Sequence, residues 1–241
     1  FEHFDSLNGY ETYGTYLKNR PKVFNPKIVP ADLRDKDIAL RVTRDMDIVI
    51  NAAAMTDGIG VFSDKEKMAE YVQDNDLINR NLIEAVCANN VKHFIFLSCT
   101  VMYPSSLVPL KESEFDSGKV HSKYSIPARM KIRGEDCCRN FASQGKTKYT
   151  AVRHTNVYGP HDKFDLTRGH VLSATITKVM GAKDRVAVWG NGKESRDFLY
   201  ITDLIDFIEK AVKGQENNFE IFNVGCGKTF SAAIYCILQC L

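Results

Sequence analysis

Apolar and polar residues follow one another along the chain in a pattern typical of buried strands separated by amphipathic helices. Short apolar runs at residues 47–54 and 91–99 are bounded by polar residues, which predicts two buried parallel strands. Between them, apolar residues recur at helical spacing from Glu66 to Asn89. This part of the chain therefore predicts a strand, a crossover helix and a second strand.

The same alternation continues toward the C-terminus. We expect a helix from Tyr124 to Ser143, a strand from Lys148 to Arg153, and a helix from Asp203 to Gly214 with Thr202 or Asp203 as its N-cap. A repeated strand and helix alternation favours a doubly wound parallel sheet of the α/β class, which is a Rossmann-like fold.

One segment departs from this alternation. Residues 186–189 and 197–201 flank a Gly190-Asn191-Gly192 turn, which predicts a two-stranded excursion that carries substrate contacts. We therefore expect a dinucleotide-binding domain over residues 1–155. Residues 156–241 are expected to combine a substrate-binding excursion with elements that return to the main sheet.

Composition narrows the class of protein. In the 241 residues, 44% are hydrophobic, enough for a sizeable core, and 32 basic against 30 acidic side chains leave a net charge of +2. This balance does not favour a nucleic-acid partner, and no apolar run is long enough to span a membrane. The seven cysteines lack paired spacing, so we expect no disulfide framework, no metal site and a cytoplasmic location.

The glycine-rich turn that opens a dinucleotide-binding fold is not evident in this sequence. Such a turn lets the backbone approach a pyrophosphate at a helix N-terminus, and no candidate with a preceding apolar strand stands before Asp32. We expect that the first strand-helix unit is absent and that the chain is part of a longer protein. The alternative is a naturally short chain.

The segment from Tyr149 to Asp203 carries the most specific motifs. It contains the run Arg153-His-Thr-Asn-Val-Tyr-Gly-Pro and, later, Trp189-Gly-Asn-Gly-Lys-Glu-Ser-Arg-Asp-Phe. These motifs resemble the nucleotide-sugar end of the extended short-chain dehydrogenase/reductases, in the NAD-dependent epimerase/dehydratase family, and are most similar to members of the GDP-fucose synthase type. The resemblance implies an NAD- or NADP-dependent epimerase or reductase that binds a nucleotide-diphosphate sugar.

Several residues resemble the cofactor-binding positions of this family. An aspartate offers acceptors to the exocyclic amine of adenine, and small residues at the carboxyl end of a strand permit close approach of a ligand. Without the resemblance, the aspartate reads as a loop residue before a helix from Leu33 to Arg44, and the helical asparagine as a solvated position. The resemblance implies cofactor contacts at Asp32, Leu33, Ala52, Ala53, Ala54, Asn75 and Ser98.

The run Ser98-Cys99-Thr100-Val101-Met102-Tyr103 resembles the strand end that supplies a catalytic hydroxyl in this superfamily. Cys99 stands at the usual position of that hydroxyl, and a thiol is a weaker hydrogen-bond donor. Either Cys99 suffices, or Ser98 or Thr100 supplies the hydroxyl. The alternative is that Cys99 is a small buried residue.

The superfamily also uses a tyrosine whose pKa is lowered by a lysine four residues later on a helix. Tyr124 resembles that tyrosine, yet the position four residues later is Ala128, and Lys131 lies seven residues on. Seven residues climb about 10 Å along a helix. Either distortion near Pro127 lets Tyr124 and Lys131 converge, or the lysine function is lost.

The remaining motif residues resemble sugar-nucleotide contacts. The family's histidine acts as an acid or base in epimerisation, its asparagine meets the substrate diphosphate, its cations approach the phosphates, and its tryptophan packs on a base or sugar. A surface or capping histidine and a core tryptophan are the alternatives. The resemblance assigns these roles to Asn156, His170, Lys178, Trp189 and Arg196.

The resemblance leaves the reaction open. Val101 occupies the place of a cysteine acid used by the double epimerases, which favours a 4-keto reductase or single-site epimerase. Val101-Met102 also replaces the Asp-Glu pair of the 4,6-dehydratases. A homodimer through the helices at 66–89 and 124–143 is implied by the resemblance. The rival interpretation is a catalytically impaired protein of this fold that serves a binding or scaffold role.

Overall fold

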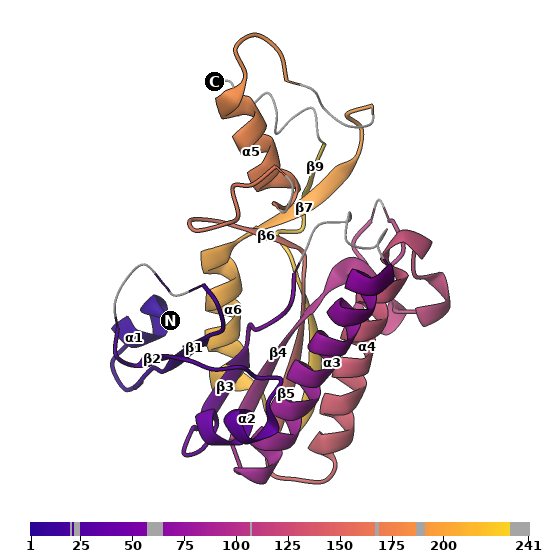
Figure 1. The fold of residues 1–241 in the computed structure, drawn as a ribbon. Helices are drawn as coiled ribbons and strands as arrows, with labels where there is room; N and C mark the ends of the chain where they lie inside the picture. Colours follow the sequence, from indigo (N-terminus) through magenta and orange to yellow (C-terminus); the bar gives the residue numbers. More distant parts are fainter. Residues whose placement is uncertain are drawn as a thin grey trace.

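A computed structural model describes residues 1–19, 21, 25–56, 65–106, 108–166, 169–186 and 191–231. Its centre is a four-stranded parallel sheet in the order β3-β4-β5-β8. The strands span β3 Ile48–Asn51, β4 His93–Cys99, β5 Lys148–His154 and β8 Phe219–Val224. Figure 1 shows this sheet in the lower part of the molecule. The predicted α/β class with a parallel, Rossmann-like sheet is confirmed.

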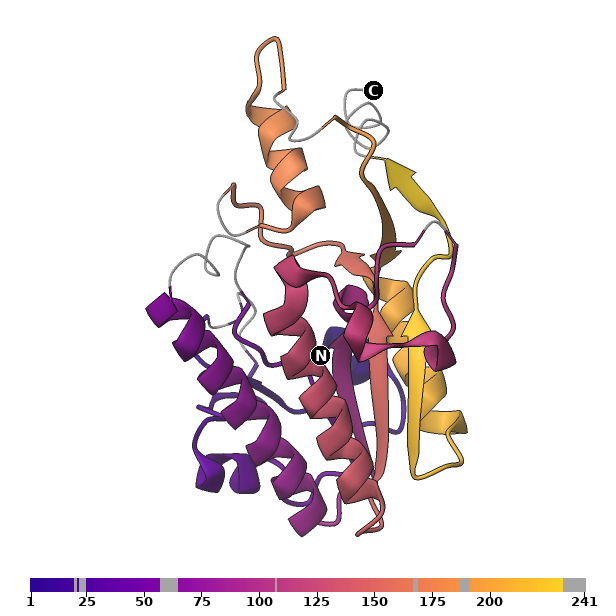
Figure 2. The same ribbon diagram turned by 90° about the vertical axis from the view of Figure 1, so that its right-hand side faces the viewer.

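Helices cover both faces of this sheet, which is why its central strands are apolar along almost their whole length. Helices α3 (Lys65–Ala88) and α4 (Ser125–Ala142) lie on one face, and α6 (Ile201–Gly214) lies on the other, as Figure 2 shows from the side. Phe94, Ile95 and Phe96 of β4 are at most 1% exposed. Phe94 and Phe96 belong to the core cluster under α3 and α4, whereas Ile95 belongs to the cluster under α6.

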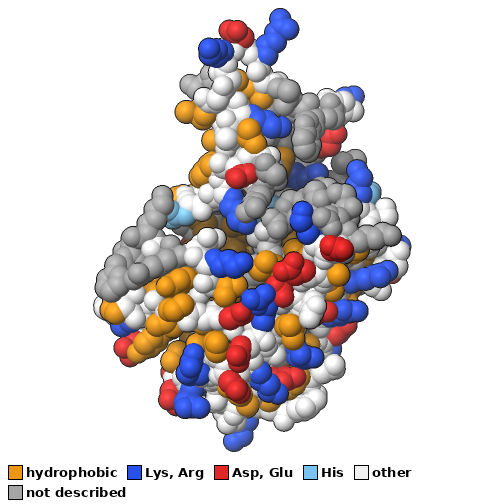
Figure 3. Space-filling view, in the orientation of Figure 1, with side chains coloured by type: hydrophobic (Ala, Val, Ile, Leu, Met, Phe, Trp, Pro, Cys, Tyr) orange, Lys and Arg blue, Asp and Glu red, His pale blue; other side chains and the backbone are white. Residues whose placement is uncertain are grey.

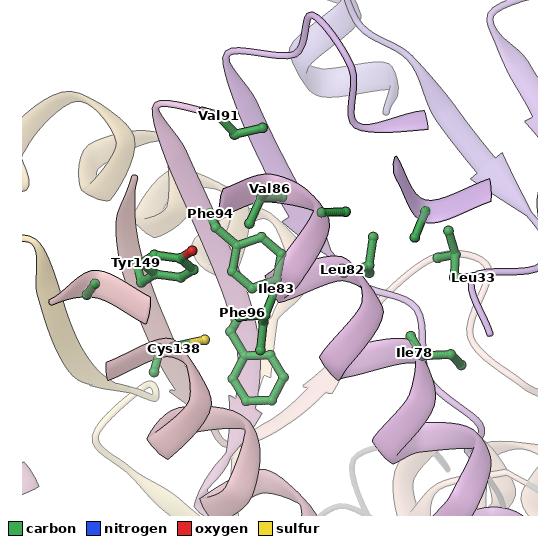
Figure 4. Packing of buried hydrophobic residues seen from close by; sticks show 14 of the residues in the cluster. Leu33, Ile78, Leu82, Ile83, Val86, Val91, Phe94, Phe96, Cys138 and Tyr149 are labelled. Atoms are coloured by element: carbon green, nitrogen blue, oxygen red, sulfur yellow. The ribbon is translucent and has the colours of Figure 1, made fainter. Parts of the chain in front are cut away.

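The larger core cluster joins α3, α4 and the sheet. Figure 4 shows Phe94, Phe96 and Tyr149 of the strands facing Ile83 and Cys138 of the two helices. The Phe94 and Tyr149 rings meet edge to face at a centroid distance of 5.8 Å. Burial of such aromatic side chains is the main source of stability in this layer.

The helix boundaries mostly follow the apolar periodicity. Helices α3 and α4 agree with the predicted ranges to within one residue at each end. Helix α6 begins two residues earlier than predicted, after Tyr200, so the predicted N-caps Thr202 and Asp203 were wrong. Both residues lie in its first turn, where the negative charge of Asp203 is favoured by the helix dipole.

Helix α2 also differs from its predicted range. It spans Lys36–Val42 instead of starting at Leu33. The cause is Asp35, whose side chain accepts hydrogen bonds from the amides of Asp37 and Ile38 and so caps the helix.

The N-terminal residues form a small unit beside the main sheet (Figure 1). Strands β1 (Gly14–Tyr16) and β2 (Ile28–Pro30) pair in parallel as a two-stranded sheet. The short helix α1 (Glu2–Ser6) places Phe4 against the cluster under α6. A hydrogen bond of 3.2 Å between His3 and Glu209 adds a second contact to α6.

A smaller lobe stands above the carboxyl end of the main sheet (Figure 1). It contains β6 (Asn156–Tyr158), α5 (Val171–Gly181), β7 (Ser195–Tyr200) and β9 (Thr229–Ser231). Strand β7 pairs in parallel with β6 and antiparallel with β9. The predicted strand at 186–189, including Trp189, lies almost wholly outside the described residues.

Four short 3-10 turns connect β4 to α4. They span η2 Thr100–Met102, η3 Glu112–Glu114, η4 Ser117–Lys119 and η5 Ser122–Tyr124.

In the part of the chain that is described, no helix has both the length and the apolar character needed to cross a membrane.

Candidate active site

The carboxyl ends of the parallel strands meet at one edge of the main sheet. The chain leaves β5 at His154 and enters β6 at Asn156, so this edge faces the lobe with α5 (Figure 1). Figure 3 shows the surface hollowed where the lobe joins the body of the molecule. Open α/β sheets bind ligands at this edge, and most of the predicted site residues are found around it.

Asp32 follows β2 and is held by Arg34. The Arg34 guanidinium donates hydrogen bonds of 2.9 and 2.6 Å to the two Asp32 carboxylate oxygens and one of 2.9 Å to Asp74. The Arg34 contacts lower the pKa of Asp32 below its usual range. The Asp32 side chain remains 34% exposed and keeps acceptor capacity for a ligand. The Leu33 side chain, in contrast, lies in the core.

Ala52, Ala53 and Ala54 follow β3. Ala52 and Ala54 are exposed, so no side chain beyond a methyl group covers the backbone there. Asn75 of α3 is only 4% exposed, and its amide group bonds both the backbone N–H and the carbonyl of Met55 at 3.1 Å. Asn75 is therefore not a solvated helix position; it fixes the segment that follows the three alanines.

The three candidates at the end of β4 have different surroundings. The Ser98 hydroxyl is fully buried and donates to Glu135 at 2.5 Å, and the Thr100 hydroxyl donates to the His154 carbonyl at 3.3 Å. Cys99 is half-buried, and the backbone amides of Val101 and Thr100 lie close to its sulfur. Burial raises the pKa of the Cys99 thiol, and the nearby Lys131 ammonium opposes that shift.

Lys131 reaches the same edge from α4. Its Nζ donates a 2.6 Å hydrogen bond to the Leu97 carbonyl and lies 5.2 Å from the centre of the Phe96 ring. Burial lowers the pKa of Lys131, while the neighbouring Cys99 and Glu135 raise it. The ammonium group is thus held at the backbone of β4, two residues before Cys99 in the strand.

Ala128 explains why no lysine stands four residues after Tyr124. Helix α4 is continuous from Ser125, with Pro127 in its first turn, where proline is tolerated. In this helix Ala128 is fully buried against Met102 and Tyr103. A lysine at this position would bury its ammonium in an apolar cluster, whereas the position of Lys131 faces the strand end.

Tyr124 is the N-cap residue of α4 and lies at the end of η5. Its ring lies 5.9 Å from the His121 ring, and it is half-buried. The described contacts include none between Tyr124 and Lys131. Tyr124 therefore lies at the start of α4 and Lys131 lies about two turns further along the helix, without a described contact between the two side chains.

A buried polar network that we did not predict lies beneath the edge. Glu135 and Arg153 form an ion pair with both side chains 3% exposed, and Arg153 also donates to the Tyr103 hydroxyl at 2.6 Å. Tyr103 in turn donates to Asn223 of β8 at 2.9 Å. Only two indications of this network are present in the sequence, namely Glu135, four residues after Lys131, and Arg153, directly before His154.

The end of β5 supplies a second group of polar residues. His154 lies opposite Cys99 in the register of β4 and β5. Asn156 is exposed, and its amide donates to the Asp197 carbonyl at 3.0 Å. The Asp197 carboxylate accepts from the Thr155 hydroxyl at 2.9 Å and so joins β7 to the end of β5. His154 and Asp197 were not among the predicted site residues.

The predicted cationic and histidine residues lie in the lobe. His170 precedes α5, is exposed, and forms no side-chain capping bond with that helix. Lys178 is in the last turn of α5 and is half-buried. Arg196 is exposed on β7, where its guanidinium donates to the Ser195 carbonyl at 3.0 Å. Trp189 lies outside the described residues.

These residues fit the adenosine half of a nicotinamide dinucleotide. The partly exposed Asp32 carboxylate and the exposed Ala52 and Ala54 leave polar acceptors and an unobstructed backbone at the carboxyl edge. The described residues contain no group of three side chains arranged to hold a metal ion. His154 and Lys131 bring two titratable side chains to the same edge.

Comparison with known proteins identifies relatives. The chain is 31% identical to the GDP-L-fucose synthase of Sinorhizobium fredii over 188 residues, which cover 76% of this chain and 59% of that enzyme. The fold is similar to that of the UDP-glucose 4-epimerase of Thermotoga maritima, with a TM-score of 0.79, 24% identity, and coverage of 96% of this chain and 74% of that one.

A third similar structure is the GDP-mannoheptose C4 reductase of Campylobacter jejuni with NADP bound, with a TM-score of 0.73 and 22% identity, covering 88% of this chain and 76% of that one. The chain thus spans about three fifths of the length of the Sinorhizobium enzyme. Residues 6–225 match a family described as the NAD dependent epimerase/dehydratase family. This match confirms the expected NAD or NADP cofactor class, and the chain belongs to that family.

Proposed function

We propose that the full protein is an NAD- or NADP-dependent epimerase or reductase that acts on a 4-keto nucleotide-diphosphate sugar. The observation that carries this proposal is the position of Lys131. Its ammonium lies near the carboxyl end of β4, 2.6 Å from the Leu97 carbonyl oxygen, although the usual lysine position is Ala128. A cation at this point stabilises negative charge on a nearby phenolate or sugar oxygen.

The cofactor half of the site uses residues that follow β2 and β3, together with a residue of α3. Asp32 accepts from the adenine amine, and the backbone at Ala52, Ala53 and Ala54 approaches the dinucleotide. Asn75 acts indirectly, because its amide holds the Met55 backbone after the alanines. When bound, the nicotinamide supplies or removes a hydride at the sugar carbon.

The residues around Lys131 handle the proton. Tyr124 exchanges a proton with the sugar 4-oxygen, and the Lys131 ammonium favours the phenolate form through its positive charge. Cys99 or Thr100 holds the same oxygen. Between these two, the Thr100 hydroxyl already donates to the His154 carbonyl, whereas the Cys99 thiol is not seen to donate to another side chain among the described residues.

The substrate half uses residues of the region 156–241. Asn156 and the cations Lys178 and Arg196 meet the diphosphate through charge-assisted hydrogen bonds. His170 serves as an acid or base, and Trp189 packs on the base or sugar. We further propose a cytoplasmic homodimer formed through α3 and α4, in which residues 1–155 form the dinucleotide-binding domain.

Tyr124→Phe tests the proposal in the full-length protein. Removal of the phenol hydroxyl removes the proton donor, so turnover of GDP-4-keto-6-deoxymannose with NADPH should fall at least about 100-fold. Tyr13→Phe, at an exposed tyrosine of the N-terminal unit, is the matched control and should keep the parent rate.

Lys131→Met tests the cation separately. We expect a comparable loss of turnover and a shift of the alkaline limb of the pH-rate profile to higher pH, because the tyrosine loses its cationic neighbour. Turnover by Tyr124→Phe at the parent rate contradicts the mechanism. A parent protein that binds the nucleotide sugar and never turns it over supports the rival binding role instead.

A further inference from the structure

His154 is a histidine of the candidate site whose role the proposed mechanism leaves open. It is the last residue of β5 and lies opposite Cys99 in the parallel register. The Thr100 hydroxyl donates to its carbonyl at 3.3 Å, and Val224 of β8 lies on its other side. The imidazole is therefore located in the middle of the carboxyl edge.

One hydrogen bond determines the tautomer of this imidazole. His154 Nδ1 lies 2.8 Å from the Thr155 carbonyl oxygen. A carbonyl oxygen can only accept a hydrogen bond, so Nδ1 carries a proton. A neutral imidazole has one N–H, so Nε2 of the neutral ring presents its lone pair.

Solvent reaches that lone pair. No hydrogen bond of His154 Nε2 is found among the described residues. Of the buried side-chain polar atoms in the described part of the chain, the Tyr149 hydroxyl alone lacks a hydrogen bond. With respect to the described residues, Nε2 is therefore unpaired but not fully enclosed.

The surroundings of the ring keep it neutral. Burial is the main cause that lowers the pKa of His154, and repulsion from the Lys131 ammonium of α4 and from His170 of the lobe lowers it further; the Thr155 carbonyl opposes the shift. Cys99 lies opposite His154 in the register of β4 and β5. The Asp197 carboxylate, the nearest acidic group on β7, bonds the Thr155 hydroxyl and the amides of Cys226 and Gly227.

We propose that His154 is a second acid-base residue of this site, with Nε2 as the atom that accepts the proton. The inference rests on the proposed function. Nε2 removes a proton from a carbon next to the sugar ketone, and the electron pair of that C–H bond moves into an enolate whose oxygen Tyr124 and Cys99 hold. Reprotonation of the same carbon on its other face, by His170 or by water, completes an epimerisation without net oxidation.

This role would supply an acid-base residue that the sequence lacks at Val101. The double epimerases use a cysteine acid where this chain has Val101, so one partner of the acid-base pair is missing there. His154 and His170 come from the two sides of the edge, the end of β5 and the start of α5. Epimerisation needs partners on opposite faces of the substrate, and two residues from different elements can supply them.

His154→Gln tests the proposal, with exchange as the readout. The full-length protein is incubated with GDP-4-keto-6-deoxymannose in D₂O without NADPH, and deuterium uptake at the carbons beside the ketone is followed by NMR. We expect the variant to exchange at least about 100-fold more slowly, while His3→Gln, on α1 and far from the edge, keeps the parent rate.

Nitrogen-15 NMR of the imidazole in the unmodified protein provides a measurement that needs no variant to fold. We expect a proton on Nδ1, an unprotonated Nε2, and titration below the usual range of histidine. A proton on Nε2, or exchange by His154→Gln at the parent rate in an active protein, overturns this inference alone. A parent protein that neither exchanges nor turns over the sugar overturns the proposed function and the inference with it.

Discussion

Gly134 of α4 packs closely against the ring of Phe96 of β4. A Cβ atom at this position would lie 2.4 Å from Cζ and 2.7 Å from Cε1 of Phe96. Phe96 is 1% exposed and is packed in the large cluster, so its ring has no free space to move into. Only glycine lets the helix approach the ring of β4 this closely.

We therefore expect Gly134→Ala to destabilise the protein. Overpacking of a core costs about 1–3 kcal/mol, and the better helix propensity of alanine offsets about 1 kcal/mol of that cost. Urea unfolding should show a net loss in the free energy of unfolding. Gly214→Ala, at the end of α6, is the control, because nothing lies within 4 Å of its added Cβ. A stability loss no larger than that of the control would contradict this account.

At the residue scale, the sequence placed several candidate site residues correctly, but it did not predict which side chains others would contact. The motif around Cys99 correctly placed that residue at a strand end of the sheet. The sequence could not show that Ser98 is bonded to Glu135, because the partner lies 37 residues away on another element. His154 was passed over because its importance depends on register with Cys99, which only strand pairing creates.

At the scale of elements, the Glu135–Arg153 pair joins α4 to the main sheet. Arg153 donates to both carboxylate oxygens of Glu135 at 3.0 and 2.7 Å, and its guanidinium stacks on the Phe115 ring at 4.6 Å. Because Phe115 lies between β4 and α4, the pair also anchors the connection that leads to Tyr124. The network thus connects α4, which carries Lys131, with the segment that leads to Tyr124.

Arg153→Met should be strongly destabilising. It leaves the Glu135 carboxylate buried without its cation, with the Ser98 hydroxyl as a neutral donor, which costs about 3–5 kcal/mol. Arg139→Met is the matched control, because Arg139 forms an exposed ion pair with Asp136 on the same helix, and exposed pairs contribute little. Urea unfolding of both variants measures the difference. Equal losses in the free energy of unfolding would show that the buried pair stabilises the protein no more than the exposed pair.

At the scale of the whole molecule, buried histidines make stability depend on pH. His93 is 4% exposed at the amino end of β4, where its Nε2 lies 2.7 Å from the Thr150 hydroxyl, which also contacts Gln215 at the end of α6. Burial is the main cause that lowers the pKa of His93, and Lys148 adds to it. Burial likewise lowers the pKa of His154.

The direction of this pH dependence follows from proton binding by the folded and the unfolded chain. Below about pH 6.5 the unfolded chain protonates these histidines, while the folded protein keeps them neutral until their lowered pKa values are reached. Stability is therefore complete above that pH and falls as the pH decreases, by at most about 1.4 kcal/mol per pH unit for each histidine.

Urea unfolding between about pH 7 and about pH 5 measures this slope. His93→Gln should reduce it, because glutamine retains hydrogen-bonding capacity and does not titrate in this range. A variant whose stability falls with the same slope as the parent would show that His93 does not contribute to the pH dependence.

By itself, the sequence determined the class of fold, the order of the main strands and helices, and the family. These depend on local signals: apolar periodicity marks buried strands and helix faces, and short motifs such as Arg153-His-Thr-Asn-Val-Tyr-Gly-Pro are continuous in the sequence. Such signals act over a few residues and need no knowledge of the partner.

Only the tertiary structure decided which side chains meet at the carboxyl edge. It placed the Lys131 ammonium on the Leu97 carbonyl, buried Ala128, and joined Glu135 of α4 to Arg153 of β5. Each of these depends on how α4 is rotated against β4 and β5, and that rotation is set by packing around Gly134 and Phe96. Contacts between distant residues follow from close packing of whole elements, which no local pattern in the chain encodes.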